Sequence, residues 1–183
     1  MSTWSRNIVL SLLLVSWFNI SAIEAPETKN INESQILFKI ERSKDPDEIW
    51  YATNLNSDGS LNQDMPIKVF WVKKTENNIV EPLTLIQKRF SYGIKAMNSV
   101  DDEGNEWHFR LAAYSDRIFK LKRMASDQYK VFTLSGTKEI ALTQIFVKFD
   151  GGSFMFPSIA YAKLIGIETQ TGIEISEVII QDK

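Results

Sequence analysis

The stretch IALTQIFVKF, residues 140–149, decides how the fold of this chain is read. Its apolar side chains fall on both faces of an extended strand, whereas a strand at a solvated surface is apolar on one face only. We therefore place residues 140–149 in the middle of a β-sheet, where both faces are covered. Residues 159–167, IAYAKLIGI, have the same character and predict a second strand of this kind.

Shorter stretches before this pair alternate apolar and polar residues with a period of two, which is typical of half-buried strands. One of them is EWHFRL, residues 106–111, in which Trp107, Phe109 and Leu111 share one face. The same reading predicts a last strand at residues 173–180, where a change of phase after Ile175 predicts a bulge. Further strands are expected at residues 36–41, 49–53, 67–71, 119–122 and 129–134.

Turn-forming residues separate nearly all of these strands. Short strands joined by short turns imply antiparallel neighbours, so the sequence predicts a mainly β fold. We expect a single antiparallel β-domain, a barrel or a sandwich, with about eight or nine strands in a meander. The turns are expected at Asp58-Gly59, Glu103-Gly104-Asn105, Gly136-Thr137, Asp150-Gly151-Gly152 and Thr171-Gly172.

The segment EPLTLIQKRFSYG, residues 81–93, departs from this pattern. Leu83, Ile86 and Phe90 are spaced three and four residues apart, which predicts one short helix at residues 82–92 with residues 87–89 partly solvated. Pro82 suits a first helical position, and Gly93 suits the residue just past a helix end. The alternative is a strand that continues into Ile94.

The N-terminal stretch MSTWSRNIVLSLLLVSWFNISA, residues 1–22, has the features of a secretory signal peptide. Arg6 supplies the positive charge, and the apolar run at residues 8–20 is shorter than the ~20 residues that a membrane-spanning helix needs. Cleavage is expected after Ala22, because cleavage after Ala25 would place a proline at the new N-terminus. Residues 23–34 are then a flexible leader, and residues 35–183 are a single β-rich domain.

The signal peptide predicts an exported protein, in the periplasm or outside the cell, whose only membrane contact is through the cleaved peptide. The chain has no cysteine, so disulfides and a lipid-anchored cysteine are excluded and the fold must rest on its apolar core. Lys and Arg number 21 against 23 Asp and Glu. This near balance argues against a nucleic-acid partner and gives no reason to expect adhesion to an anionic membrane.

Three groups of residues carry a resemblance to a known family. They are ILFKIERSK (36–44), KVFWVKK (68–74) followed by LTLIQKRFSYGIKA (83–96), and LTQIFVKFDGG (142–152) with YAKLIGIETQTG (161–172). Together they resemble the exported bacterial family catalogued as domain of unknown function 4833. The resemblance covers the chain from about residue 35 to its end and implies one intact exported domain. The family has no assigned activity, so it implies no functional residues.

His108 is the only histidine, and a Ser/His/Asp triad would have to use it. No G-x-S-x-G nucleophile motif accompanies it, and one imidazole without a thiol cannot fill a zinc site with His and Cys ligands. We interpret His108 as a polar strand residue opposite Trp107 and Phe109.

The loop NLNSDGSLN, residues 54–62, resembles the start of a calcium-binding EF-hand loop. Its first position is Asn54 rather than an aspartate, and the twelfth is Met65 where a bidentate glutamate is needed. We interpret this loop as a polar hairpin connection. The acidic cluster Asp101, Asp102, Glu103 and Glu106 is likewise interpreted as a solvated turn.

Two basic groups, Lys88-Arg89 and residues 120–123, are interpreted as solvated faces. The abundant aromatic residues are interpreted mainly as core, with the alternative that several line a cavity for an apolar or sugar ligand. They are Trp50, Tyr51, Phe70, Trp71, Phe90, Tyr92, Trp107, Phe109, Phe154 and Phe156.

Two functions remain open, and for neither does the sequence identify a catalytic, metal-binding or cofactor-binding residue. The first is a non-catalytic binding or interaction domain of the cell envelope, whose partner is unknown and could be a small apolar ligand or an envelope protein. The alternative is an exported hydrolase that uses carboxylates as acid and base. Two carboxylates facing each other in a cleft, one of them desolvated, would favour the hydrolase.

Overall fold

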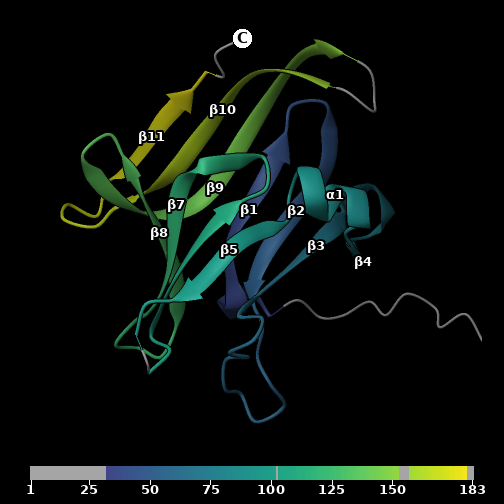
Figure 1. Cartoon of the computed structure of the whole chain (residues 1–183). Coiled ribbons are helices and arrows are strands. Elements are labelled where there is room, and N and C mark those ends of the chain that lie inside the picture. The colour runs from purple at the N-terminus through teal and green to yellow at the C-terminus, as the bar shows by residue number, and fades with distance from the viewer. Residues whose placement is uncertain (1–31, 102, 153–156, 181–183) are drawn as a thin grey trace, which may run out of the picture.

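The computed structural model describes residues 32–101, 103–152 and 157–180 (Figure 1). The predicted signal peptide, residues 1–22, lies outside the described residues, as does most of the predicted leader. The end of the leader is described, and there Asn32 caps a 3-10 helix, η1 (Glu33–Gln35). The described strands are β1 (Ile36–Arg42), β2 (Asp45–Thr53), β3 (Ile67–Lys73), β4 (Ile79–Pro82), β5 (Ile94–Ser99), β6 (Glu106–Leu111), β7 (Tyr114–Arg123), β8 (Tyr129–Ser135), β9 (Lys138–Gly152), β10 (Pro157–Glu168) and β11 (Glu174–Ile179). The described helices are α1 (Leu85–Phe90) and a second 3-10 turn, η2 (Lys74–Glu76).

Strand β9 is the centre of the sheet, as predicted for residues 140–149. Strand β10 runs antiparallel along one edge of β9. A strand has two edges, so both remaining neighbours must pair with the other edge of β9. Residues 138–141 pair antiparallel with β8, and residues 144–147 pair in parallel with β1. Two groups of strands therefore leave the same edge of β9.

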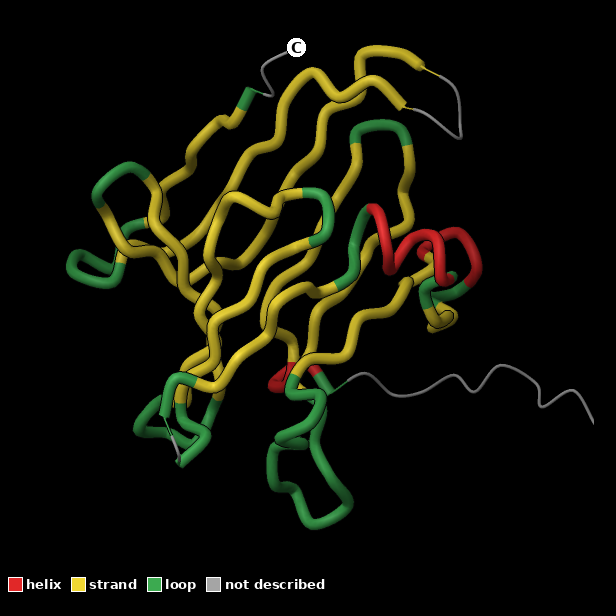
Figure 2. The backbone as a smooth tube through the Cα atoms, viewed as in Figure 1, coloured by secondary structure: helices red, strands yellow, loops and turns green. Residues whose placement is uncertain are grey.

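The two groups are antiparallel meanders of four strands each. Their order in the sheet is β4-β3-β2-β1-β9-β8-β7-β6-β5, with β10 and β11 on the far side of β9. We call β1–β4 the first wing and β5–β8 the second wing. Because the wings diverge from one edge, the sheet curls into a half-barrel in which they face each other (Figures 1 and 2).

The prediction of an antiparallel meander is therefore only partly right. The pairing of β1 with β9 is parallel, the meander is split into two, and the described strands number eleven rather than eight or nine. The sequence missed β4 and β5, the outermost strands of the wings. Strand β4 has four residues and ends in Pro82, and β5 contains a residue with positive φ, Ala96, and an irregular register, so neither shows a regular alternation.

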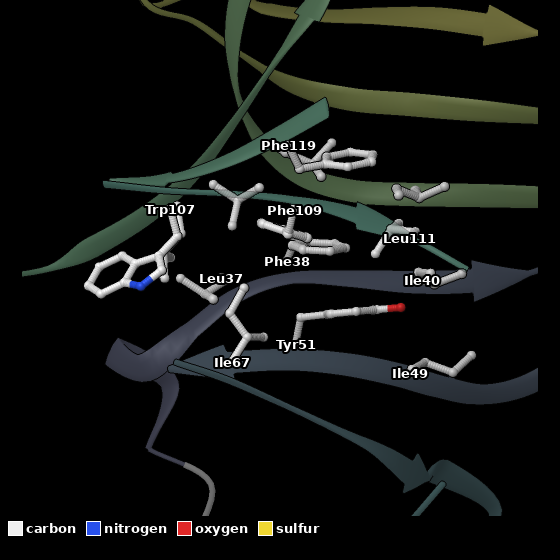
Figure 3. Close-up of a cluster of buried hydrophobic side chains, with 14 of the residues drawn as sticks. Leu37, Phe38, Ile40, Ile49, Tyr51, Ile67, Trp107, Phe109, Leu111 and Phe119 are labelled. Atoms are coloured by element: carbon white, nitrogen blue, oxygen red, sulfur yellow. The ribbon is translucent and has the colours of Figure 1, made fainter. Parts of the chain in front are cut away.

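The core lies between the wings and contains a row of four buried aromatic rings. Phe38 of β1 stacks on Tyr51 of β2 with centroids 4.2 Å apart, and on Phe119 of β7 at 6.5 Å. Phe119 in turn stacks on Phe109 of β6 at 5.5 Å. Figure 3 shows these rings reaching toward each other from the two wings. For Phe109 this agrees with the alternation in residues 106–111, which puts it on one face with Trp107 and Leu111.

Helix α1 differs from its prediction in its start and in the face that it buries. It begins at Leu85 after the cap Thr84, whereas Pro82 belongs to β4. Thr84 and Gln87 form a reciprocal capping box, and Gln87 Oε1 also accepts a hydrogen bond from Trp71 Nε1 at 3.2 Å. These bonds turn Gln87 inward, so Ile86 and Phe90 project into solvent. No helix in the described part of the chain has the length and hydropathy of a membrane span.

The segment after α1 connects the first wing to the second. The hydroxyl of Tyr51 donates a hydrogen bond of 2.6 Å to the Tyr92 carbonyl, and Gly93 accepts one of 2.8 Å from Ala112 N. A Cβ atom on Gly93 would lie 1.9 Å from the carbonyl oxygen of Lys88, so this crossing requires glycine. Complete burial raises the pKa of Tyr51 well above its usual value, which keeps the hydroxyl protonated as a donor.

Two details near the C-terminus also differ from the prediction. The register of β10 with β11 is continuous, so the expected bulge in the last strand is wrong. The apolar residues of both phases are accommodated because Ile175 and Ile179 are half-buried while Val178 and Ile180 are exposed. Residues 150–152, expected as a turn, continue β9, because Gly152 still pairs with Pro157.

We expect Phe38→Ala to lower the free energy of unfolding by about 3–5 kcal/mol, because it removes a ring between two others and leaves a cavity. The matched control Phe90→Ala should change it by less than about 0.5 kcal/mol, because this ring is exposed. Urea unfolding followed by tryptophan fluorescence measures both. Equal losses in the two variants would contradict the assignment of core and surface.

Candidate functional site

The candidate site is an apolar groove beside the core, with a volume of about 850 Å³. Its floor is the concave face of β1, β9, β10 and β11, and its rim is formed by the end of α1 and the turn between β6 and β7. The lining residues are Ile40, Phe90, Ser91, Tyr92, Leu111, Ala113, Tyr114, Ser115, Asp116, Ile145, Val147, Phe149, Ile159, Ala162, Leu164, Ile179 and Ile180. This volume and this composition fall within the range of small-molecule sites.

The floor of the groove is aliphatic and the polar groups gather at one side. Ile145 and Leu164 are buried and face each other across paired strands β9 and β10. The hydroxyls of Ser91 and Ser115 and the carboxylate of Asp116 belong to the rim next to α1 and β7. The site therefore combines an apolar floor with hydrogen-bonding groups at one side.

An ion pair joins two strands that border the groove without pairing with each other. Arg117 of β7 donates to both carboxylate oxygens of Glu177 of β11, at 2.9 and 3.0 Å. The guanidinium also lies 5.3 Å from the ring centre of Tyr114, a lining residue. A bidentate pair of this kind fixes orientation as well as distance, so it holds β7 and β11 at a defined separation.

The buried carboxylates lie outside the groove and are paired with lysines. Burial raises the pKa of Glu48, but Trp50 Nε1 at 2.6 Å, Lys39 at 3.0 Å and Lys74 at 3.2 Å outweigh burial, so the pKa is lowered. Burial also raises the pKa of Asp47, but hydrogen bonds from Thr75 and Lys73 outweigh burial and lower the pKa. Hydrogen bonds from Thr171 and Lys138 lower the pKa of Glu168. These groups are held as carboxylates, which does not suit a general acid.

His108 lies where the sequence placed it, on the face of β6 opposite Trp107 and Phe109. It is half-exposed, and its Nε2 lies 2.8 Å from Glu106 Oε1. The acidic cluster next to it caps its own turn: Asp101 Oδ1 accepts from Asn105 N at 2.8 Å. Backbone donors outweigh burial there and lower the pKa of Asp101. Asp102 lies outside the described residues.

In the loop that resembles an EF-hand, side-chain oxygen atoms accept hydrogen bonds from within the loop. Asp58 Oδ1 accepts from the backbone N and the hydroxyl of Ser60, at 2.9 and 2.6 Å, which lowers the pKa of Asp58. Asn62 Oδ1 accepts from Met65 N at 2.9 Å. Within residues 32–101, 103–152 and 157–180, no three acidic or His side chains gather as metal ligands. The loop is a self-bonded connection between β2 and β3.

The two basic groups differ in their pairing. Lys120 and Lys122 approach Glu139 at 3.8 and 3.3 Å, and Arg123 pairs with Asp127 at 3.0 Å. Lys88 and Arg89 of α1 have no carboxylate partner among the described residues; Arg89 lies over the ring of Phe90 at 5.3 Å. Lys88 and Arg89 thus present free positive charge.

Among the aromatic residues named in the sequence analysis, Tyr51, Trp71, Trp107 and Phe109 belong to the core, as interpreted. Trp50 and Phe70 are only half-buried and lie outside this core, and Phe90 and Tyr92 border the groove. Phe154 and Phe156 lie outside the described residues. Sequence reasoning missed the aliphatic lining of the groove, because Ile and Leu residues in β9 and β10 look the same whether they face packed core or open space. The one available signal was that both strands are apolar on both faces.

These features define a class: a curled β-sheet domain with an apolar groove between the sheet and a single short helix. The family model for domain of unknown function 4833 matches residues 38–178, and the chain belongs to this family. The searches found no matching curated protein and no matching solved structure.

We expect His108→Ala to leave the fold intact and to change the free energy of unfolding by less than about 1 kcal/mol, because its one side-chain hydrogen bond, to Glu106, is half-exposed. Chemical denaturation of the variant beside the wild type checks this. A loss of several kcal/mol would mean that His108 has a structural role that its contacts do not explain.

The lowered pKa of Glu48 predicts a pH-dependent contribution to stability. Since its folded-state pKa lies below the unfolded value, the ionised carboxylate stabilises the fold at neutral pH, and this is lost as pH falls through the folded-state pKa. Glu48→Gln should therefore be less stable than the wild type at about pH 7, with a gap that narrows toward about pH 3. Urea midpoints across this range provide the measurement, and a constant gap would refute the prediction.

Proposed function

We propose that this protein is an exported, non-catalytic binding domain that holds a small apolar ligand in the groove. The observation that carries the proposal is the groove itself, which has about 850 Å³ of space above a floor of Ile, Val and Leu side chains. Water forms no hydrogen bonds with such a floor. Replacing this water with an apolar ligand is therefore favoured by roughly 25 cal/mol per Å² of apolar surface removed from water.

The arrangement of the lining suggests the class of ligand. An apolar body fits against Ile145, Val147 and Leu164, which come from neighbouring strands. At the rim, the hydroxyls of Ser91 and Ser115 can donate or accept hydrogen bonds, whereas an ionised Asp116 carboxylate acts only as an acceptor. We infer an amphipathic molecule with a hydrogen-bond donor, a hydroxyl or an amine, at its polar end.

The alternative of a carboxylate hydrolase has less support. Asp116 is the one carboxylate among the described lining residues, whereas acid and base catalysis by carboxylates uses a pair. The described carboxyl groups whose pKa values shift all shift downward. A raised pKa in the groove would have favoured the enzyme.

The proposal is tested by binding of the fluorescent apolar probe N-phenyl-1-naphthylamine. In Ala162→Trp, the indole would occupy the groove between Val147 and Ile179, so the apparent Kd should rise at least about tenfold. The control Lys163→Trp places the same ring on the opposite face of β10 and should bind within about twofold of the wild type. Equal probe binding by all three proteins would contradict a ligand site in the groove.

A further inference from the structure

Helix α1 exposes its apolar side chains instead of burying them. Leu85, Ile86 and Phe90 are 83%, 66% and 63% exposed. The orientation is fixed by the first turn, because Thr84 and Gln87 bond each other in the capping box and Gln87 also accepts a hydrogen bond from Trp71. The outward face is therefore a built feature of the crossover between the two wings.

Positive charge without a carboxylate partner among the described residues lies in α1 and shortly after it in the chain. Lys88 and Arg89 lie in α1, and Lys95 follows shortly after it in β5, directly opposite Arg110 of β6. Among the residues that the structure describes, none of these four cations has a carboxylate partner. Like charges directly opposite on neighbouring strands destabilise a sheet, so Lys95 and Arg110 suit an external negative charge better than they suit each other.

We propose that α1 docks on an anionic lipid bilayer, with Leu85 and Ile86 in the headgroup region and the four cations on lipid phosphates. Exposed Leu and Phe beside Lys and Arg are the composition of interfacial membrane helices. The net charge of the chain gave no indication of this, because the positive charge is local. A role of this docking in ligand delivery rests on the proposed function. Phe90 borders the groove, so an apolar molecule that leaves the bilayer would pass this ring to reach the groove.

The size of the apolar face favours a bilayer over a protein partner. A stable protein interface covers about 800 Å² on each side, which three side chains of a six-residue helix do not supply. A bilayer needs only a few inserted side chains, and each nearby Lys or Arg adds about 1 kcal/mol of attraction to anionic lipid. The expected binding is therefore weak, reversible and sensitive to salt.

Sedimentation with vesicles tests the proposal. The protein without its predicted signal peptide, residues 23–183, should bind vesicles of equal parts phosphatidylcholine and phosphatidylglycerol and bind pure phosphatidylcholine at least about tenfold more weakly. Leu85→Ser combined with Ile86→Ser should lower the partition coefficient at least about tenfold. Lys88→Gln combined with Arg89→Gln should lower it and flatten its salt dependence. Since the replaced residues are exposed, far-UV circular dichroism and urea midpoints should match the wild type.

Two controls separate this surface from the groove and from general stickiness. Ile173→Ser removes an equally exposed apolar residue, 62% exposed, in the turn before β11 and should leave vesicle binding unchanged. Ala162→Trp should also bind vesicles normally, so loss of probe binding and loss of docking are distinguishable. Docking by α1 is refuted if Leu85→Ser with Ile86→Ser binds vesicles like the wild type, or if Ile173→Ser weakens binding equally. A wild-type dimer that these α1 changes convert to a monomer would refute it in favour of self-association.

Discussion

The shared edge of β9 is the constraint on which the rest of the structure depends. Residues 144–147 of β9 pair in parallel with β1, and the four residues at the start of the same strand pair with β8. This arrangement brings together segments more than a hundred residues apart in the sequence. Because both wings leave the same edge, the sheet twist carries them over each other, and the aromatic row from Tyr51 to Phe109 can form between them. We call the parallel pairing of residues 39–42 with 144–147 the seam. It is expected to form slowly, because the entropy cost of closing the long loop is met before the stabilising contacts form.

The groove follows from the same geometry. Where the wings face each other, their apolar sides fill the space between them with side chains. Strands β10 and β11 lie beyond β9 and have no opposing wing, so their concave apolar side remains open apart from α1 and the β6–β7 turn. The crossover that joins the wings thus also forms the rim of the proposed site, and the Tyr51 hydroxyl ties this rim to the core through Tyr92.

How much the sequence could predict depends on how local each feature is. Alternation, together with two stretches that are apolar on both faces, identified nine of the eleven described strands, the buried side of β6 and the central place of β9, because these signals lie within single strands. The parallel seam could not be predicted, since nothing in residues 39–42 or 144–147 distinguishes a parallel from an antiparallel partner. The face of α1 was predicted wrongly, because one polar contact, Gln87 to Trp71, and the capping box outweighed apolar spacing in a helix of six residues. The groove was missed because an aliphatic side chain does not reveal what lies in front of it.

Amide hydrogen exchange, resolved by residue, tests the central claim most directly. The account predicts that the hydrogen-bonded amides at residues 39–42 and 144–147 exchange slowest, at the rate of global unfolding, because the seam cannot open without separating the wings. Amides of the outer strands β4 and β11 should exchange much faster through local opening. Fast exchange at the seam while the rest of β9 remains protected would contradict the account, since the wings would then be held together by something other than their common edge.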